Sequence, residues 1–260
     1  MSDLTNPTRR ELLTVLAGVS LASLTGCGGG AGTPAPTAVP ATSLLIPAYF
    51  FDPLLWAQIL PAHTPAHTLI VNVATGPGTI LDSVWQGRFN TAKANGHRLV
   101  GYVDTTFAAR AANLVQADIT AWQTLYGITD IFFDQVSSLP ADIAYYQNLL
   151  ATIRTRIPNA RIILNCGAVP DLGYFKIDTL TEVVIFESTW TLYQAQTFPA
   201  TLTPYWSRSH LMVNTAPTAA LTSVHNFAGA HGAAGYFVTD MTTMNYTTSL
   251  PSYWAAELAL

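Results

Sequence analysis

Eight short apolar runs, each ending in a polar or aromatic residue, recur along this 260-residue chain and constrain its fold more than any other feature. The ends of consecutive runs lie roughly 22 to 31 residues apart, which is the length of one βα unit. Continuous apolar runs of this kind are typical of strands that are buried on both faces of a parallel sheet. The runs are Leu44–Phe51, Thr68–Ala74, Leu99–Val103, Ile131–Phe133, Ile162–Leu164, Val183–Phe186, Leu211–Val213 and Tyr236–Val238.

Segments with helical periodicity separate these runs. Ile80–Asn95 and Ile143–Ile157 carry apolar residues at helical spacing, and similar stretches are Asp118–Tyr126, Thr218–Ala230 and Pro251–Leu260. Eight strands alternating with eight helical stretches predict an α/β fold, a single-domain (β/α)8 barrel of the TIM type over residues 44–260. An open, doubly wound sheet is the alternative, but no GxGxxG follows the first strand and the count of eight favours closure.

Composition excludes several classes of function. Half of the residues are hydrophobic, only 10% are charged, the formal net charge is −4, and no basic run is present, so we expect no nucleic-acid partner. The 6 histidines show no ligand spacing, and there is neither CxxC nor HExxH, so we expect no metal site and no cofactor. The absence of GxSxG argues against serine hydrolase chemistry.

The amino-terminal region has the features of an export signal. Thr8–Leu13 resembles a twin-arginine motif, and the apolar stretch after it is too short to span a bilayer. The stretch ends in a Leu-Thr-Gly-Cys sequence that resembles a bacterial lipobox, so we interpret residues 1–26 as a signal peptide and Cys27 as the lipid attachment site. An uncleaved anchor with an incidental cysteine is the alternative. Residues 27–43, rich in Gly, Pro, Ala and Thr, are predicted to be a tether.

These features together predict a location and an arrangement for the mature chain. We expect it in the bacterial cell envelope, on the extracytoplasmic side, held to the membrane only through its amino-terminal lipid. We expect the barrel domain to be a monomer.

The ends of the strands define the candidate site, because active sites of such barrels lie at the carboxyl ends of their strands. Carboxylates are scarce, and those that fall on strand ends are Asp52, Asp104, Asp134, Glu187 and Asp240. The carboxylates on helical stretches are interpreted as solvated or capping residues, and they are Asp118, Asp142 and Glu257.

Alternation along the strands favours one pair of these carboxylates. Asp134 shares a strand face with Phe132, and Glu187 shares one with Ile185 and Val183. If those faces point to the barrel axis, the two carboxylates converge over the mouth. Two carboxylates flanking a cleft are what glycoside hydrolysis requires, and partial burial raises a carboxyl pKa toward the useful range. The structural alternative is that Asp134 caps the next helix and Glu187 bonds a neighbouring loop.

The other strand ends carry aromatic and neutral polar side chains, which suit the faces and hydroxyl groups of sugar rings. The predicted substrate-binding residues are Tyr49, Asn72, Tyr102, Asp104, Gln135, Asn165, Trp190, Asn214 and Asp240.

Six short motifs follow one another along the predicted strands and their loops. They are Ile46-Pro47-Ala48-Tyr49, Val71-Asn72-Val73 with Gly76-Pro77-Gly78, Gly101-Tyr102-Val103-Asp104-Thr105 with Arg110, Phe132-Phe133-Asp134, Phe186-Glu187 and Val238-Thr239-Asp240. In this order they resemble the motifs of the spherulin-4-like proteins, the spherulation-specific family, from about Leu44 to Trp254. The resemblance implies a (β/α)8 barrel and an endo-acting glycoside hydrolase on α-1,4-linked N-acetylgalactosamine or galactosamine exopolysaccharide.

The fourth strand of that family usually ends in Asp then Glu, and the sixth supplies a Glu. This sequence matches the first and last positions at Asp134 and Glu187, but the middle position is Gln135, which cannot transfer a catalytic proton. Two functions therefore stay open: an extracytoplasmic polysaccharide hydrolase that uses Asp134 and Glu187, and a catalytically degenerate barrel that binds glycan. A structural lipoprotein is a third possibility, which the many polar and aromatic strand ends disfavour.

Overall fold

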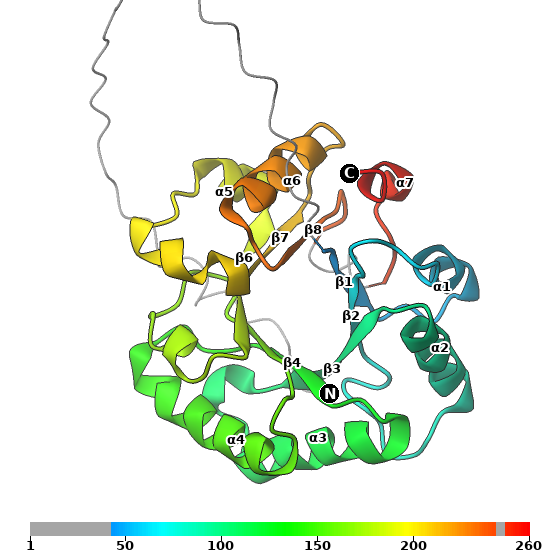
Figure 1. Ribbon diagram of the computed structural model, residues 1–260, viewed down its shortest axis with the longest axis vertical. Helices are drawn as coiled ribbons and strands as arrows, with labels where there is room; N and C mark the ends of the chain where they lie inside the picture. Colours follow the sequence, from blue (N-terminus) through cyan, green and yellow to red (C-terminus); the bar gives the residue numbers. More distant parts are fainter. Residues whose placement is uncertain (1–42, 243–247) are drawn as a thin grey trace, which may run out of the picture. The chain divides into compact units, whose positions relative to one another are not determined.

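The structure is a computed structural model that describes residues 43–242 and 248–260. Within them, eight parallel strands form one sheet in sequential order, β1 through β8. Figure 1 shows the strands as a ring with the helices around it, so the expected (β/α)8 barrel is confirmed. The strands are β1 (Leu45–Ala48), β2 (Thr68–Val71), β3 (Arg98–Asp104), β4 (Asp130–Asp134), β5 (Ile162–Asn165), β6 (Thr181–Thr189), β7 (Ser209–Asn214) and β8 (Gly235–Val238).

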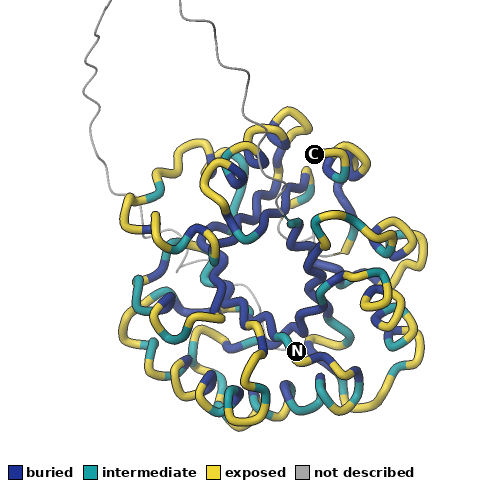
Figure 2. The backbone as a smooth tube through the Cα atoms, viewed as in Figure 1, coloured by how far each residue is buried: buried dark blue, intermediate teal, exposed yellow. Residues whose placement is uncertain are grey.

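The helices surround the sheet, and their buried faces turn toward it, as the distribution of burial in Figure 2 shows. The α-helices in the described part of the chain are α1 (Pro53–Ile59), α2 (Ser83–Ala94), α3 (Ala112–Tyr126), α4 (Ile143–Arg156), α5 (Trp190–Ala195), α6 (Ala220–His231) and α7 (Trp254–Glu257). Short 3-10 helices are η1 (Thr106–Ala108), η2 (Pro140–Asp142), η3 (Tyr174–Lys176) and η4 (Ala200–Arg208).

The connection between β5 and β6 departs from the expected pattern of eight helical stretches. It contains only η3, because its polar side chains bond their own backbone and compete with helix formation. Asp171 Oδ1 accepts a hydrogen bond from the Gly173 amide at 2.7 Å, and Asp178 Oδ1 accepts one from the Leu180 amide at 2.9 Å. Gly167, at φ 64°, also turns the chain away directly after β5.

The first two apolar runs continue beyond their strands. β1 ends at Ala48 because the chain turns toward α1, whose first turn is capped by Asp52 accepting from the Leu54 amide at 2.7 Å. β2 ends at Val71 because Asn72 Oδ1 accepts from the Gly76 amide at 2.7 Å and closes a turn. Apolar residues after these strand ends therefore belong to loops at the mouth, the end of the barrel where the carboxyl ends of the strands lie.

The seam between β1 and β8 is short. The two strands are joined by one bridge, Leu44 to Tyr236, with the Tyr236 amide bonded to the Ser43 carbonyl at 3.2 Å. Further along β8, the Val238 amide donates instead to Oε1 of Glu257 at 2.9 Å. The expectation that Glu257 is solvated or caps a helix is wrong: its exposed fraction is 2%, and it replaces a strand partner at the seam.

A charged layer fills the amino-terminal end of the barrel. The Glu182 carboxylate accepts from His210 Nε2 at 2.7 Å and pairs with Arg98 at 3.4 Å and with Arg161. Burial alone would raise the pKa of Glu182, but the hydrogen bond and charge of His210 and the two arginines lower it to about 2. Glu182 thus lies at the amino-terminal end of the barrel, where side chains stabilise the fold.

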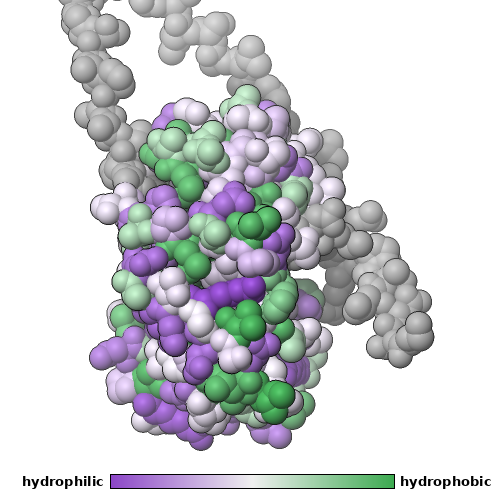
Figure 3. All heavy atoms as spheres, turned by 90° about the vertical axis from the view of Figure 1, so that its right-hand side faces the viewer, coloured by the Kyte–Doolittle hydropathy of each residue, from purple (hydrophilic) through white to green (hydrophobic). Residues whose placement is uncertain are grey.

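The outer surface is mixed in polarity. Figure 3 views the side of the barrel that carries α1 and α2, where apolar patches alternate with hydrophilic ones. No helix in residues 43–242 or 248–260 is long and apolar enough to cross a membrane. The predicted signal peptide, Cys27 and almost all of the predicted tether lie outside the described residues.

Candidate active site

Four of the predicted site residues meet at the carboxyl ends of β3, β4, β5 and β6. The amide nitrogen of Asn165 lies 2.8 Å from Oδ1 of Asp134 and 2.6 Å from Oε2 of Glu187, so one amide donates to both carboxylates. The Tyr102 hydroxyl donates to the other oxygen of Asp134, Oδ2, at 2.9 Å. The two carboxylates that alternation pairs are therefore neighbours in the structure.

The bridging amide limits how far apart the two carboxylates lie. The two hydrogen bonds to Asn165 together set an upper limit of about 5.4 Å on the distance between Oδ1 of Asp134 and Oε2 of Glu187. Carboxyl groups lie about 5–5.5 Å apart in retaining glycosidases and about 6.5–9.5 Å apart in inverting ones, so two carboxylates that share one amide favour the retaining arrangement.

The environment of Asp134 favours its protonated form. Burial is the largest effect and raises the pKa of its carboxyl group above the ordinary value. The hydrogen bonds from Asn165, from the backbone of Gln135 and from Tyr102 act in the opposite direction, and the negative charge of Asp104 adds to the rise. Burial likewise raises the pKa of Tyr102, so its hydroxyl stays a neutral donor.

A β-bulge in β6 brings Glu187 into this cluster. The register against β7 shifts between Val184 and Phe186, so Glu182 and Glu187 both face the barrel axis although five positions separate them. The expectation that Glu187 shares a face with Val183 is therefore wrong, because Val183 alternates with the inward-facing Glu182. The prediction that Glu187 points to the mouth of the barrel is right only because the bulge shifts the alternation of side chains by one residue and so turns Glu187 inward.

A small cavity of about 40 Å³ opens inside the barrel beside Asp134 and Asn165. Tyr49, just after β1, lines it and packs edge to face on Tyr102, with ring centroids 5.6 Å apart. The set of predicted site residues omitted four lining residues, although each lies two positions from a predicted one on the same strand face and could have been found by alternation. They are Pro47, Ile70, Phe132 and Met212.

Three other predicted substrate-binding residues hold loops in place. Asn72 Oδ1 accepts from the Gly76 amide, and Asp240 Oδ1 accepts from the Ser252 amide at 3.1 Å. Asp104 accepts from the amide of Thr106 at 2.7 Å and from its hydroxyl at 3.0 Å. Their side-chain oxygens are therefore engaged with the protein itself.

The remaining predicted residues surround the cluster in different ways. Gln135 is exposed, follows β4 directly and has a φ of 50°. Trp190 begins α5 and stacks on Tyr193 with ring centroids 5.6 Å apart. Asn214 ends β7 with an exposed fraction of 3%, and neither polar atom of its side chain has a hydrogen-bond partner.

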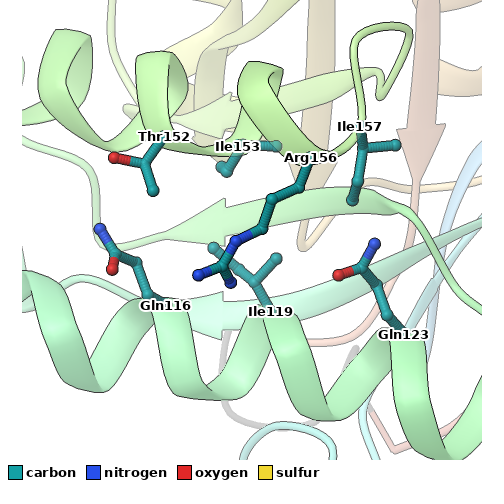
Figure 4. Close-up of a pocket in the computed structure, with 7 residues that line it drawn as sticks. All are labelled: Gln116, Ile119, Gln123, Thr152, Ile153, Arg156 and Ile157. Atoms are coloured by element: carbon teal, nitrogen blue, oxygen red, sulfur yellow. The ribbon is translucent and has the colours of Figure 1, made fainter.

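Neither a metal cluster nor the outer pocket offers a competing site. In residues 43–242 and 248–260, no group of three or more His, Cys, Asp or Glu side chains is arranged to hold a metal ion. Figure 4 shows a pocket of about 10 Å³ between α3 and α4, on the outside of the barrel. Its lining holds one charged residue, Arg156, and no carboxylate.

Comparison with known proteins gives matches by sequence and by fold. Residues 43–260 match the family described as Spherulation-specific family 4. Spherulin-4 of Physarum polycephalum is 34% identical over 148 residues, which are 55% of this chain and 44% of Spherulin-4, so the chain spans less than half of that relative.

Among solved structures, Aspergillus clavatus Sph3 in complex with GalNAc has a TM-score of 0.71 and 22% identity and covers 85% of this chain and 97% of its own. The glycoside hydrolase domain of PelA from Pseudomonas aeruginosa is a weaker match, with a TM-score of 0.41 and 11% identity over 77% of this chain and 95% of its own. The barrel fold is thus shared with Sph3. Because its family match covers the whole described barrel, the chain belongs to spherulation-specific family 4.

Proposed function

We propose that this chain is an endo-acting glycoside hydrolase that cleaves an amino-sugar-containing polysaccharide with Asp134 and Glu187. The observation that carries the proposal is the Asn165 amide, which binds both carboxylates at 2.8 Å and 2.6 Å at the barrel mouth. Neighbouring carboxylates of this kind protonate the leaving oxygen and attack the sugar. The GalNAc in the Sph3 complex and the resemblance to spherulin-4-like proteins support a polymer that contains N-acetylgalactosamine or galactosamine.

The different surroundings of the two carboxylates suggest their roles. Asp134 is the general acid, because burial raises the pKa of its carboxyl group and so favours the protonated form that a general acid needs. Glu187 is then the nucleophile, which forms a glycosyl–enzyme bond as the leaving-group oxygen takes the proton from Asp134. Asp134 next removes a proton from water, and the attack of that water frees Glu187 and regenerates both groups.

The purified chain is expected to release new reducing ends from an α-1,4-linked N-acetylgalactosamine/galactosamine polymer, and products of several lengths would indicate endo cleavage. Because the paired oxygens are at most about 5.4 Å apart, we expect net retention at the anomeric carbon, read by proton NMR during the first turnovers. Starch serves as the control polymer. Absence of new reducing ends would refute the hydrolase, and inversion would refute Glu187 as nucleophile.

A second candidate function, glycan binding without turnover, is favoured by Gln135. This residue follows Asp134, is exposed, and carries an amide where the resemblance to the family leads one to expect a second acid. The degenerate barrel would bind the same polymer but release no reducing ends.

Substituting Gln135→Glu separates the two candidates. If Asp134 and Glu187 suffice, the wild-type chain is active and the variant changes kcat by less than about tenfold, while the added negative charge raises the pKa of Asp134 further. If the missing acid is essential, the wild type is inactive and the variant gains turnover. Reducing-end assays over a range of pH on both proteins, with Gln135→Ala as the uncharged control, decide between these results.

A further inference from the structure

The loop between β3 and α3 has an unusual backbone. Thr106, Phe107 and Ala108 have φ angles of 46°, 54° and 68°, so three consecutive residues that are not glycine adopt the left-handed region. Each side chain in that region is disfavoured by contact of its Cβ with the backbone, and such conformations persist only where surrounding contacts impose them.

The contacts that impose this conformation come from the candidate active site. The Phe107 amide donates to the Gln135 carbonyl at 2.7 Å, and the Thr105 hydroxyl donates to the same carbonyl at 2.9 Å. Asp104 holds the amide and the hydroxyl of Thr106, and Arg110 donates to the Asp104 carbonyl at 2.9 Å. Hydrogen bonds to the Gln135 carbonyl therefore hold the strained turn against the backbone that follows Asp134.

The turn presents an aromatic ring to solvent. Phe107 has an exposed fraction of 54%, and its ring stacks on no other ring of the described chain. Phe51, after β1, is exposed to 58%, but its ring packs on Trp85 with centroids 5.8 Å apart. Exposure of a large apolar side chain on a strained backbone stabilises neither the turn nor the core. Strain stored in this way indicates a function for the residue that is presented.

Across the described chain, the other strained residues also lie at the mouth. The remaining positive φ angles of residues other than glycine occur at Thr75, Gln135 and Thr215, which follow β2, β4 and β7. Phe107 offers a flat, exposed apolar face, and its amide donates to the carbonyl of Gln135, the residue that follows Asp134. A sugar ring has an apolar face of C–H groups that packs on such an aromatic face.

We propose that Phe107 is a stacking subsite for a sugar ring of the polysaccharide, next to Asp134, and that the left-handed turn exists to hold its ring there. The inference rests on the proposed function for the identity of the ligand. It adds a binding residue and a cause for the strain of the loop. It predicts that replacing Phe107 by glycine lowers the affinity for the polysaccharide and raises the stability of the fold.

Four substitutions separate the ring from the strain. Phe107→Leu removes the aromatic face but keeps the strained backbone, so affinity is expected to fall about two- to tenfold with an unchanged Tm. Phe107→Gly removes both, so affinity falls equally while Tm rises by about 2–4 °C. Ala108→Gly relieves strain and keeps the ring, so Tm rises and affinity is unchanged. Phe107→Tyr leaves both properties near those of the parent.

Binding is measured by affinity electrophoresis in gels that contain the α-1,4-linked N-acetylgalactosamine/galactosamine polymer, with starch as control, in an Asp134→Asn background so that no cleavage intervenes. Unchanged affinity in Phe107→Leu and Phe107→Gly would overturn the subsite, as would failure of the parent to bind the polymer at all. Binding that depends on Phe107 in a protein whose wild type shows no turnover would uphold the subsite and refute only the hydrolase. Loss of affinity in Ala108→Gly equal to that in Phe107→Leu would also overturn it, because the loop and not the ring would then matter.

Discussion

Replacing Glu187 by glutamine is expected to abolish hydrolysis of the polysaccharide, and replacing Asp134 by asparagine to slow it by about 10³-fold or more. An amide neither attacks the anomeric carbon nor delivers a proton to the leaving oxygen. Both substitutions preserve the shape of the side chain. In the wild type the Asn165 amide nitrogen lies 2.8 Å from Asp134 and 2.6 Å from Glu187, and each new amide keeps an oxygen that can accept this hydrogen bond. The loss therefore reports chemistry and not collapse of the site.

The leaving group distinguishes the two roles. With an oligosaccharide that carries a dinitrophenolate leaving group, departure needs no proton, so the Asp134→Asn variant is expected to give a rapid burst of dinitrophenolate and then slow turnover. The Glu187→Gln variant is expected to give no burst. Stopped-flow absorbance measures the burst, and added azide should accelerate the slow phase of Asp134→Asn by replacing water as the attacking group.

Asp52→Asn is the matched control, since Asp52 is another carboxylate that follows a strand, but it caps α1, a role that asparagine fills equally well. Its activity should equal that of the wild type. Full hydrolysis of the polymer by Asp134→Asn would show the assignment to be wrong, and a burst confined to Glu187→Gln would reverse the roles.

Much of the barrel could be predicted because its signals are local. Apolar runs at a βα spacing specify strands of a parallel sheet, and the change from apolar to polar residues marks the carboxyl ends where ligands bind. Alternation then places Tyr102 and Asp134 on the inward face of neighbouring strands, and the structure joins them by a hydrogen bond of 2.9 Å. Residue type and the two-residue alternation of strand side chains were sufficient to predict the pairing of Tyr102 with Asp134.

The remainder depends on contacts between segments far apart in the sequence, which no local pattern encodes. The bulge that turns Glu187 inward arises from the pairing of β6 with β7, and Asn165 bridges two carboxylates only because β5 lies between their strands. The left-handed turn at Phe107 contains no glycine, so its sequence resembles an ordinary loop. Its conformation is imposed by the backbone of Gln135.

Glu257 is the clearest case of a role that sequence concealed, and it predicts the second large effect. The glutamate lies at the end of a short helix, where a charged residue is normally solvated, yet burial against the β1–β8 seam raises its pKa to about 8. The hydrogen bond from the Val238 amide opposes this rise but does not overcome it. At neutral pH the folded protein therefore keeps Glu257 protonated, whereas the unfolded chain ionises it near its ordinary value of 4.5.

This difference makes the free energy of unfolding depend on pH in a defined direction. Below pH 4.5 both states hold the proton, and the full stability is present. Between pH 4.5 and 8 the folded state binds one more proton than the unfolded chain, so the contribution of Glu257 falls with rising pH by about 1.4 kcal/mol per unit. Above pH 8 the loss is complete, at a few kcal/mol.

Glu257→Gln keeps an oxygen that accepts from the Val238 amide and removes the ionisable proton. Its advantage in stability over the wild type is expected to be small at pH 5 and to grow to a few kcal/mol at pH 8.5, or roughly 5–10 °C in Tm. Urea unfolding of both proteins across this range measures the difference, and taking the difference cancels the titration of Asp134, Glu182 and the other groups that both proteins share. Asp52→Asn serves as control, with the same Tm offset at both pH values. An advantage that does not change with pH would mean that Glu257 is already ionised in the folded protein, and that the seam accommodates a buried negative charge.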